Sequence, residues 1–273
     1  MLSVADFKKL TDVIYRRTGI KIELKRYEVL KPKLERVFEQ FGYDDFRSFF
    51  HDFRFEKNPD LIQEILNTVT INETYFFREK YQFETLINEV LPHLHQIRPP
   101  DETIRILCAP SSTGEEPYTI ALALLDEGQL LKARDFELVG IDIDSKAIEK
   151  ARAAVYTPRS VQQVPPHLLQ QYFIQRPDGK YELVDFLKEV VNFQVVNVME
   201  RQAMRRLGKF DVIFCRNMLI YFDEISRREV AMTFYELLKP KGAVFLGHAE
   251  SMNRIVSVFK TVRSGETIYY VKE

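Results

Sequence analysis

The sequence predicts an α/β fold, in which an all-helical N-terminal region precedes a doubly wound, mostly parallel sheet. The first observation is the stretch 104–128, which reads as a strand, a tight turn and a helix: IRILCAPSSTGEEPYTIALALLDEG. The second is a further apolar run at 136–141 that ends in an acid. The third is that residues 1–91 carry their apolar residues at helical spacing. A strand–turn–helix unit followed by another strand is how a doubly wound sheet begins.

The turn after the first strand contains one glycine, Gly114, and two carboxylates, Glu115 and Glu116. A pyrophosphate site here uses G-x-G-x-x-G, so that the backbone can approach the phosphates at the helix N-terminus. Two glutamates would repel a pyrophosphate and suit a ligand with an ammonium and a sulfonium, such as S-adenosylmethionine (SAM). The alternative is that both acids only complement the helix macrodipole. Pro117 suits the first turn of this helix, and Gly128 is expected to end it.

An acid also follows the second strand. Asp142 comes directly after the run Phe136–Ile141, and in nucleotide-binding α/β folds a carboxylate at this point binds ribose hydroxyls. Asp144 comes two residues later, just before the helical pattern that begins at Ser145. One of the two acids is therefore a candidate ribose ligand, and the other is a candidate helix cap.

The N-terminal region is expected to form several helices. They begin after Ser3, near Lys31, around Phe46 and after Pro59, and Gly19 is expected to end the first of them. The first 36 residues carry ten basic and five acidic side chains. This excess predicts either a face that steers an acidic partner or an ordinary solvated face.

The remaining segments complete the sheet. Residues 157–189 are too many for a bare loop, and two short strand-like runs flank the turn signal RPDGK, so a small antiparallel insertion is expected. The third strand ends near Asn197. The fourth strand, 210–215, is followed by Arg216 and Asn217, where open α/β sheets bind ligands. A helix, a fifth strand and a closing hairpin follow.

Composition argues against several classes of protein. The net charge is −1, with 29% charged and 45% hydrophobic residues, which argues against broad nucleic-acid binding. The two cysteines, Cys108 and Cys215, have no metal-ligand spacing. The N-terminus lacks the apolar stretch of a signal peptide, and there is no run of about 18 apolar residues. We therefore expect no metal site, no membrane span and a cytoplasmic location.

Four separated segments carry a family resemblance: NETYFFRE at 72–79, CAPSSTGEEPYTIA at 108–121, GIDID at 140–144 and CRNMLIYF at 215–222. In this order they resemble the CheR family of chemotaxis receptor glutamate O-methyltransferases, over nearly the whole chain. The resemblance implies a class I SAM-dependent, Rossmann-like methyltransferase fold, with S-adenosylhomocysteine as the product. It also implies a helical domain at 1–91 and a methyltransferase domain at 92–273, with a β-subdomain inserted at 158–189.

The resemblance further implies roles for individual residues. The segment 72–78, which alone would read as an interhelical loop, is placed over the cofactor. Arg78 and Tyr221 are the candidates to orient the substrate carboxylate; the alternatives are a cofactor contact for Arg78 and a core aromatic role for Tyr221. The expected cofactor contacts are Asn72, Thr74, Arg78, Glu116, Asp142, Asn197, Val198, Arg216 and Asn217.

The implied substrate is a glutamate on the methylation helices of a chemoreceptor's cytoplasmic domain, approached by the basic N-terminal helices. A glutamate side chain is ionised at pH 7, so no catalytic His or Cys dyad is expected. In some family members the β-subdomain holds a receptor's C-terminal pentapeptide. The hairpin here is short, with only Gly179 at its tip, which argues against such a tether. The enzyme is expected to be a monomer.

Three other functions share parts of this pattern. A nicotinamide oxidoreductase would share the fold, but the glycine-poor turn disfavours it. A nucleic-acid methyltransferase would share the cofactor, but no N-P-P-Y or D-P-P-Y follows the fourth strand. The third is a regulatory or scaffold protein of a chemosensory pathway, which would bind SAM without methylating receptors.

Overall fold

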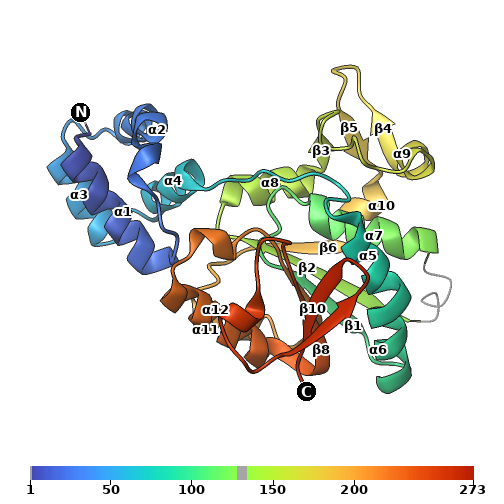
Figure 1. The fold of residues 1–273 in the computed structure, drawn as a ribbon. Coiled ribbons are helices and arrows are strands. Elements are labelled where there is room, and N and C mark those ends of the chain that lie inside the picture. Colours follow the sequence, from blue (N-terminus) through green and yellow to red (C-terminus); the bar gives the residue numbers. More distant parts are fainter. Residues whose placement is uncertain (1, 128–133) are drawn as a thin grey trace.

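The computed structural model describes residues 2–127 and 134–273 (Figure 1). Among these residues, no helix is both long enough and apolar enough to cross a membrane. The helical domain contains α1 (Val4–Thr18), a 3-10 turn (Leu24–Arg26), α2 (Tyr27–Gln40), α3 (Phe46–Arg54) and α4 (Pro59–Val69). The hydroxyl of Ser3 caps α1 by accepting from the backbone N–H of Asp6, and Gly19 ends it with a φ of 71°. The predicted start and stop signals of this helix are confirmed.

Helix α2 begins one turn earlier than the sequence predicts. Pro32 suits a first helical turn, which favours a start near Lys31. In the structure the helix begins at Tyr27, directly after the 3-10 turn, and Pro32 lies inside it. Leu30 and Leu34 are buried in the core of the domain, and this burial outweighs the hydrogen bond that proline cannot donate.

A long helical segment follows the first domain and packs on the sheet. It consists of α5 (Lys80–Thr85), a π-helical turn (Leu86–Val90) and α6 (Leu91–Ile97). Its apolar residues share a hydrophobic core with the sheet, whereas the core of the N-terminal helices ends at Val69. The expected domain boundary after residue 91 falls inside this segment. We propose that the helical domain ends near residue 70.

Within the described residues, the main sheet has seven strands in the order β6-β2-β1-β7-β8-β10-β9. They are β1 (Ile104–Cys108), β2 (Phe136–Asp142), β6 (Val191–Val195), β7 (Phe210–Cys215), β8 (Leu238–Leu246), β9 (Lys260–Ser264) and β10 (Thr267–Val271). Strand β1 pairs in parallel with β2 and β7, and the antiparallel hairpin β9–β10 joins the sheet at β8. This topology confirms the class I methyltransferase fold.

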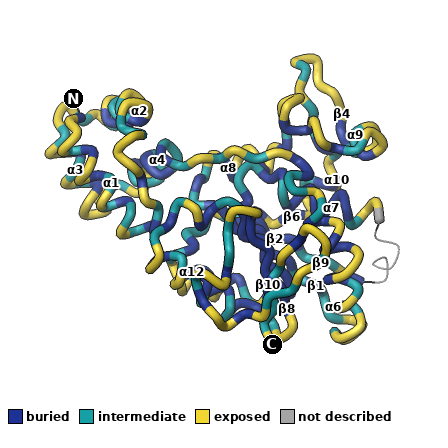
Figure 2. Tube along the Cα trace, viewed as in Figure 1, coloured by how far each residue is buried: buried dark blue, intermediate teal, exposed yellow. Residues whose placement is uncertain are grey.

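Helices cover both faces of the sheet, so its strands form the buried centre of the domain (Figure 2). Successive residues of a strand alternate between two hydrophobic cores; in β1, Ile106 belongs to one and Leu107 to the other. The helices are α7 (Glu115–Glu127) and α8 (Ser145–Ala153) on the first face, with the α5–α6 segment, and α11 (Arg201–Arg206) and α12 (Glu224–Leu237) on the second. Gly128, the expected end of α7, lies outside the described residues.

A small antiparallel sheet projects from the domain, at the top right of Figure 1. Its strands are ordered β3-β5-β4, and the hairpin β4–β5 is the one that the turn signal predicts. Strand β3 has only two residues, too few to show a period. The elements are β3 (Val155–Tyr156), α9 (Pro166–Tyr172), β4 (Phe173–Gln175), β5 (Tyr181–Leu183) and α10 (Asp185–Lys188).

Hydrogen bonds fix the helical domain against the main sheet's carboxyl ends. The backbone N–H of Lys21 donates to the carbonyl of Tyr221 at 2.8 Å, and Ile20 forms an isolated antiparallel bridge with Phe222. The side-chain amide of Asn197 donates to the carbonyl of Arg17 at 2.8 Å. The helical domain is therefore held beside the edge of the sheet where α/β folds bind their ligands.

Candidate active site

A cleft opens at the carboxyl ends of β1, β2, β6 and β7. Strand β1 is the switch point of the sheet, because the chain continues to β2 and β6 on one side and to β7 and β8 on the other. Ligands of open α/β sheets bind at such a point. The empty space inside the cleft, including the solvent at its open mouth, is about 1080 Å³.

Every residue that the sequence analysis assigns to the cofactor or to catalysis lines this cleft. These residues come from the segment before α5, the turn after β1, the ends of β2 and β6, and the loop after β7. They are Asn72, Thr74, Arg78, Glu116, Asp142, Asn197, Val198, Arg216, Asn217 and Tyr221. The four motifs, far apart in the sequence, therefore meet in space.

Asp142 is held by the backbone at the end of β2. Its two carboxylate oxygens each accept a hydrogen bond of 2.9 Å, one from the N–H of Ser112 and one from the N–H of Asp144. The residue is 5% exposed, and burial raises the pKa of its carboxyl from 3.8 to about 6. Each oxygen keeps a further lone pair, so the carboxylate can still accept hydrogen bonds from ligand hydroxyls.

Asp144 is the helix cap of the pair. One of its oxygens accepts from the N–H of Ala147 at 3.0 Å, in the first turn of α8. The other accepts from the hydroxyl of Thr70 at 2.7 Å and from the amide of Asn72 at 2.6 Å. Asp142 therefore faces the cleft, whereas Asp144 caps a helix and fastens the start of the segment that precedes α5.

The two glutamates of the turn face different neighbours. Glu115 is 4% exposed and accepts from the hydroxyls of Thr113 at 2.6 Å and Ser160 at 2.8 Å. It does not line the cleft, so the expectation that both acids face a cationic ligand is wrong for Glu115. Glu116 lines the cleft and lies 3.0 Å from Nη1 of Arg216. Burial raises the pKa of Glu116, although Arg216 acts in the opposite direction.

Arg216 is the centre of a buried ion-pair network. Its side chain is 3% exposed, and its guanidinium lies 3.0 Å from the carboxylate of Glu116 and 3.3 Å from that of Glu79. It also donates to the backbone carbonyl of Arg78 at 2.5 Å. Arg216 therefore sets the positions of Glu116 and of the backbone at Arg78. The sequence analysis misses Glu79, although this residue directly follows Arg78.

The loop after β7 depends on Glu250, which the sequence analysis does not identify. One oxygen of its carboxylate accepts from the N–H of Asn217 at 2.8 Å and from the N–H of Gly247 at 2.9 Å. These bonds hold Asn217 in a left-handed conformation with a φ of 58°, which asparagine tolerates better than most residues. No motif marks Glu250, because its role arises only where the loops after β7 and β8 meet.

The backbone at Arg78 is held in place by the two buried residues that precede it. Phe76 and Phe77 are buried in the core of the sheet, at 0% and 4% exposure. The Nη1 atom of Arg78 donates to the carbonyl of Glu73 at 3.1 Å, and its guanidinium carbon lies 5.7 Å from the ring centre of Tyr75. The half-buried side chain thus lies along the wall of the cleft.

The helical domain also contributes to the wall of the cleft. Thr18, Ile20 and Arg26 line it from the segment after α1, and Val69 and Thr70 line it from the end of α4. None of these positions belongs to a sequence motif. Their contribution depends on how the two domains pack together, which no local pattern reveals.

Three buried polar atoms of residues that line the cleft have no hydrogen-bond partner in the part of the chain that the structure describes: Ser111 Oγ, Glu116 Oε1 and Arg216 Nε. Buried polar groups in native proteins nearly always have a partner, so these atoms indicate a ligand or ordered water. SAM carries an ammonium, a carboxylate and ribose hydroxyls, which supply both donors and acceptors. The residues of the cleft therefore fit this cofactor.

Comparison with known families decides the assignment. Residues 5–70 match the family described as CheR methyltransferase, all-alpha domain, and residues 72–268 match CheR methyltransferase, SAM binding domain. The chain belongs to the CheR methyltransferase family. The two CheR regions meet where the hydrophobic cores separate, near residue 70.

Full-length relatives agree with the CheR assignment. Chemotaxis protein methyltransferase 2 of Vibrio cholerae is 43% identical over 273 residues, which cover 100% of this chain and 94% of that protein. The chemotaxis protein methyltransferase of Salmonella typhimurium is 35% identical, over 98% of this chain and 90% of that protein. The Escherichia coli protein of that name is also 35% identical, over 98% and 91%. The chain is a SAM methyltransferase of the chemotaxis type.

Proposed function

We propose that this chain transfers a methyl group from SAM to glutamate side chains in the cytoplasmic domains of chemoreceptors. The products are glutamate methyl esters and S-adenosylhomocysteine, in chemotaxis adaptation or related chemosensory signalling. The observation that most supports this protein-glutamate O-methyltransferase activity is the cleft. It combines the buried carboxylate of Asp142 with an oxygen of Glu116 that has no partner within the described residues, and both acids lie in the matched SAM-binding region.

In this proposal the two acids of the cleft bind different parts of the cofactor. Asp142 accepts hydrogen bonds from the ribose hydroxyls, as an acid after the second strand does in nucleotide-binding folds. Glu116 binds the ammonium through Oε1. When bound, SAM supplies a methyl group on a sulfonium, which an anionic oxygen can accept without first losing a proton. The other cofactor contacts in this proposal are Asn72, Thr74, Asn197, Val198, Arg216 and Asn217.

Catalysis then consists mainly of orientation. A glutamate side chain is already ionised at neutral pH, so the cleft does not need a general base. Holding the reacting groups in line can contribute roughly 7–11 kcal/mol in favourable cases. Arg78 and Tyr221 line the cleft, and we assign them to the carboxylate. A guanidinium suits this task because it is permanently charged and binds a carboxylate in a fixed plane.

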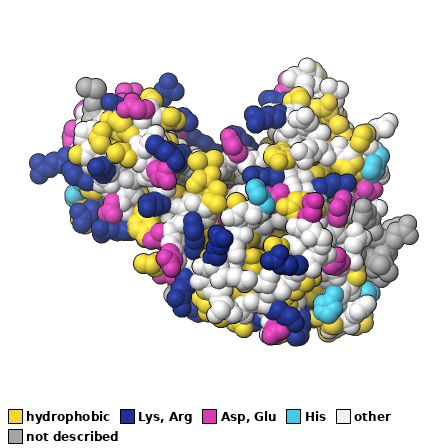
Figure 3. Space-filling view, viewed as in Figure 1, with side chains coloured by type: hydrophobic (Ala, Val, Ile, Leu, Met, Phe, Trp, Pro, Cys, Tyr) yellow, Lys and Arg dark blue, Asp and Glu magenta, His cyan; other side chains and the backbone are white. Residues whose placement is uncertain are grey.

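The exposed cations of the helical domain form the receptor-facing surface in this proposal. Figure 3 shows Lys and Arg side chains gathered over this domain, at the left of the view. Lys8, Lys33 and Arg36 are among the exposed ones. A basic surface speeds the approach of an acidic partner and does so less at high salt. This surface would approach the glutamate-bearing methylation helices.

The small sheet contributes little to receptor tethering in this proposal. Strands β4 and β5 have three residues each, so a receptor peptide that extended this sheet would find few backbone partners. We therefore expect a receptor without its C-terminal pentapeptide to be methylated at an almost unchanged rate.

The proposal is tested with methyl-labelled SAM and a panel of chemoreceptor cytoplasmic fragments. We expect label on at least one fragment, released as methanol by mild base because the product is an ester. The matched control is the same fragment with its candidate glutamates replaced by alanine, and DNA and RNA are assayed in parallel. If calorimetry shows SAM binding but no fragment gains base-labile label, the scaffold function replaces the enzyme.

A further inference from the structure

Arg26 is a cation of the helical domain that turns toward the cleft. It is the last residue of the 3-10 turn Leu24–Arg26 and lines the same cleft as Tyr221. Its side chain is partly buried, whereas the neighbouring cations Lys21 and Lys25 are exposed. Arg26 therefore differs from the rest of the basic segment, which faces solvent.

The guanidinium of Arg26 is anchored at one nitrogen. Its Nη1 donates to the carbonyl of Val69 at 2.9 Å, which leaves the donors on Nε and Nη2 for another partner. The turn that carries Arg26 is itself fastened to the sheet, through the hydrogen bond from Lys21 to Tyr221 and the bridge between Ile20 and Phe222. The cation is thus presented from a fixed position.

The three arginines that line the cleft differ in the partners of their guanidinium groups. Arg216 forms ion pairs with two carboxylates of the chain. Among the described residues, Arg26 and Arg78 form no ion pair, and the hydrogen bonds from their side chains go to backbone carbonyls. Burial lowers the pKa of Arg26 from its ordinary value, as expected of a cation that has lost part of its hydration. Such a group gains from an anionic ligand.

The proposed reaction brings two carboxylates to this cleft, one on the cofactor and one on the substrate. Arg78, which the proposed function assigns to the substrate carboxylate, and Arg26 both lack an ion pair within the described residues, so both can contact these anions. Arg78 lies in the matched SAM-binding region, whereas Arg26 lies in the all-alpha region that also carries the basic surface. A receptor docked on this surface would therefore lie beside the wall of the cleft to which Arg26 belongs.

We propose that Arg26 binds the carboxylate of the substrate glutamate, so that the helical domain supplies a substrate-binding residue to the active site as well as a docking surface. This inference rests on the proposed function, because it takes the substrate to be an anionic side chain of a protein. A guanidinium here favours an ionised glutamate over a neutral amide of the same shape, since only the former makes charge-assisted hydrogen bonds.

The test compares wild type with Arg26→Gln, Arg26→Lys and Arg263→Gln in the full chain. Arg263 is an exposed arginine of β9, outside the helical domain, and does not line the cleft, so its variant is the matched control. We measure kcat and KM for a receptor cytoplasmic fragment, and the Kd for S-adenosylhomocysteine by calorimetry. For Arg26→Gln we expect kcat/KM for the receptor to fall roughly 10- to 100-fold, with the Kd almost unchanged. Arg26→Lys should lie between this variant and wild type, and Arg263→Gln should match wild type.

The outcomes separate the inference from the function on which it rests. A wild type that puts no methyl ester on any receptor fragment overturns the proposed function, and the inference with it. An active wild type with an unchanged kcat/KM in Arg26→Gln overturns the inference alone. A weakened Kd with an unchanged KM for receptor would show that Arg26 holds the cofactor, which also overturns the inference. If Arg26→Gln fails to fold, Arg26→Lys decides: wild-type values in both measurements overturn the inference, and a reduced kcat/KM with unchanged Kd supports it.

Discussion

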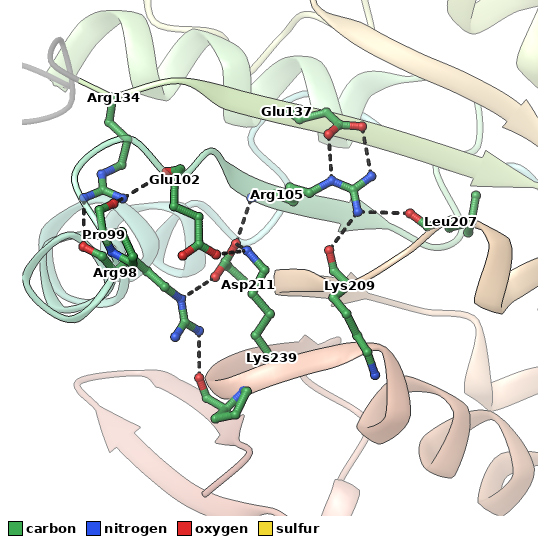
Figure 4. Close-up of polar contacts among 11 residues, drawn as sticks. Arg98, Pro99, Glu102, Arg105, Arg134, Glu137, Leu207, Lys209, Asp211 and Lys239 are labelled. Carbon is green, nitrogen blue, oxygen red and sulfur yellow. Dashed lines mark hydrogen bonds and ion pairs between the residues drawn. The ribbon is translucent and has the colours of Figure 1, made fainter.

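The two ends of the main sheet bury their charges in different ways. At the amino end, Asp211 in β7 is fully buried and accepts from Arg98 at 2.7 Å, Lys239 at 2.8 Å and the N–H of Arg105 at 3.0 Å (Figure 4). Both of its oxygens are satisfied within the chain. At the carboxyl end, Glu116 keeps an oxygen without a partner in the described residues.

Two further arginines at this end also have their partners within the chain, although Arg105 and Glu137 are partly exposed. Arg105 binds both oxygens of Glu137, at 2.6 and 3.0 Å, and two backbone carbonyls, as Figure 4 shows. Arg134 donates to the carbonyls of Pro99 and Glu102 at 2.9 and 3.0 Å. A buried charge that serves the fold finds its partners in the chain. A buried charge without a partner is an indicator of a ligand site only where it also lines a cleft, since Glu250 Oε1 and Arg17 Nη1 lack a partner within the described residues and line no part of the cleft at the carboxyl end.

The largest expected effect is at the satisfied end. Asp211→Ala leaves Arg98 and Lys239 without their buried partner, and we expect the free energy of unfolding to fall by about 3–5 kcal/mol. Urea unfolding measures this loss. Binding of S-adenosylhomocysteine by the folded fraction should be unchanged. A variant with normal stability and weakened binding would reverse the roles that the comparison assigns to the two ends.

The next effect is the pH dependence that Asp142 causes. Its carboxyl has a pKa of about 6 in the folded chain, against an ordinary value of 3.8. Below pH 4 both states are protonated and the effect is absent. Between pH 4 and 6 the folded state holds the proton while the unfolded state loses it, so stability falls as pH rises, and the full cost remains above pH 6.

Asp142→Asn removes this cost, which can reach about 3 kcal/mol at pH 7. We expect the variant to be more stable than wild type at neutral pH and to bind S-adenosylhomocysteine more weakly. Binding by wild type should weaken as pH falls through 6, because an ionised carboxylate is the better acceptor for ribose hydroxyls. Chemical unfolding and calorimetry at a series of pH values measure both. A variant less stable than wild type at pH 7 would contradict the expectation.

A smaller effect separates the two glutamates of the turn. Glu116→Gln removes the charge that faces the cleft, and we expect the binding free energy of S-adenosylhomocysteine to weaken by about 1.5–3 kcal/mol. Glu115→Gln is the matched control, since Glu115 is equally an acid of this turn but bonds to Thr113 and Ser160. Its binding should match wild type, and its stability at neutral pH should not fall, because burial raises the pKa of the Glu115 carboxyl as it does that of Asp142. Equal losses of affinity in both variants would contradict the assignment of the ligand contact to Glu116 alone.

The smallest expected effect is at Arg78. Arg78→Lys keeps the charge and loses the planar pair of donors. If Arg78 orients the substrate, kcat falls while affinity for S-adenosylhomocysteine is little changed, and we expect a fall of about tenfold. If Arg78 only holds the cofactor, the affinity for S-adenosylhomocysteine falls and kcat at saturating SAM is unchanged. Steady-state kinetics and calorimetry on one preparation separate the two, and wild-type turnover by Arg78→Ala would remove the residue from the mechanism.

The sequence predicts most of the fold and many of the residues that line the cleft, because much of that information is local. Ser3 and Gly19 bound α1 through their own chemistry. The strand–turn–helix around Gly114 and the acid at Asp142 place the cleft at the switch point of the sheet. The resemblance adds the segment around Arg78, which no periodicity would have placed there.

The sequence does not predict which polar groups are already satisfied. Glu115 and Glu116 are adjacent acids in one turn, and only packing against Ser160 turns the first away from the cleft. Glu250 and Arg26 belong to no motif, since each acts through a contact between segments distant in the chain. The boundary that we propose near residue 70, in place of the expected one after residue 91, rests on the same kind of contact, because the helices α5 and α6 belong to the core of the sheet.

The central claim is that the open polar atoms at the carboxyl end of the sheet are completed by the cofactor. A crystal structure with S-adenosylhomocysteine bound tests it most directly. We predict that the ligand occupies the cleft, that its ammonium lies within hydrogen-bond distance of Glu116 Oε1, and that its ribose hydroxyls bond to Asp142. A ligand bound elsewhere, or one bound in the cleft while Glu116 Oε1 keeps no partner, would contradict the account.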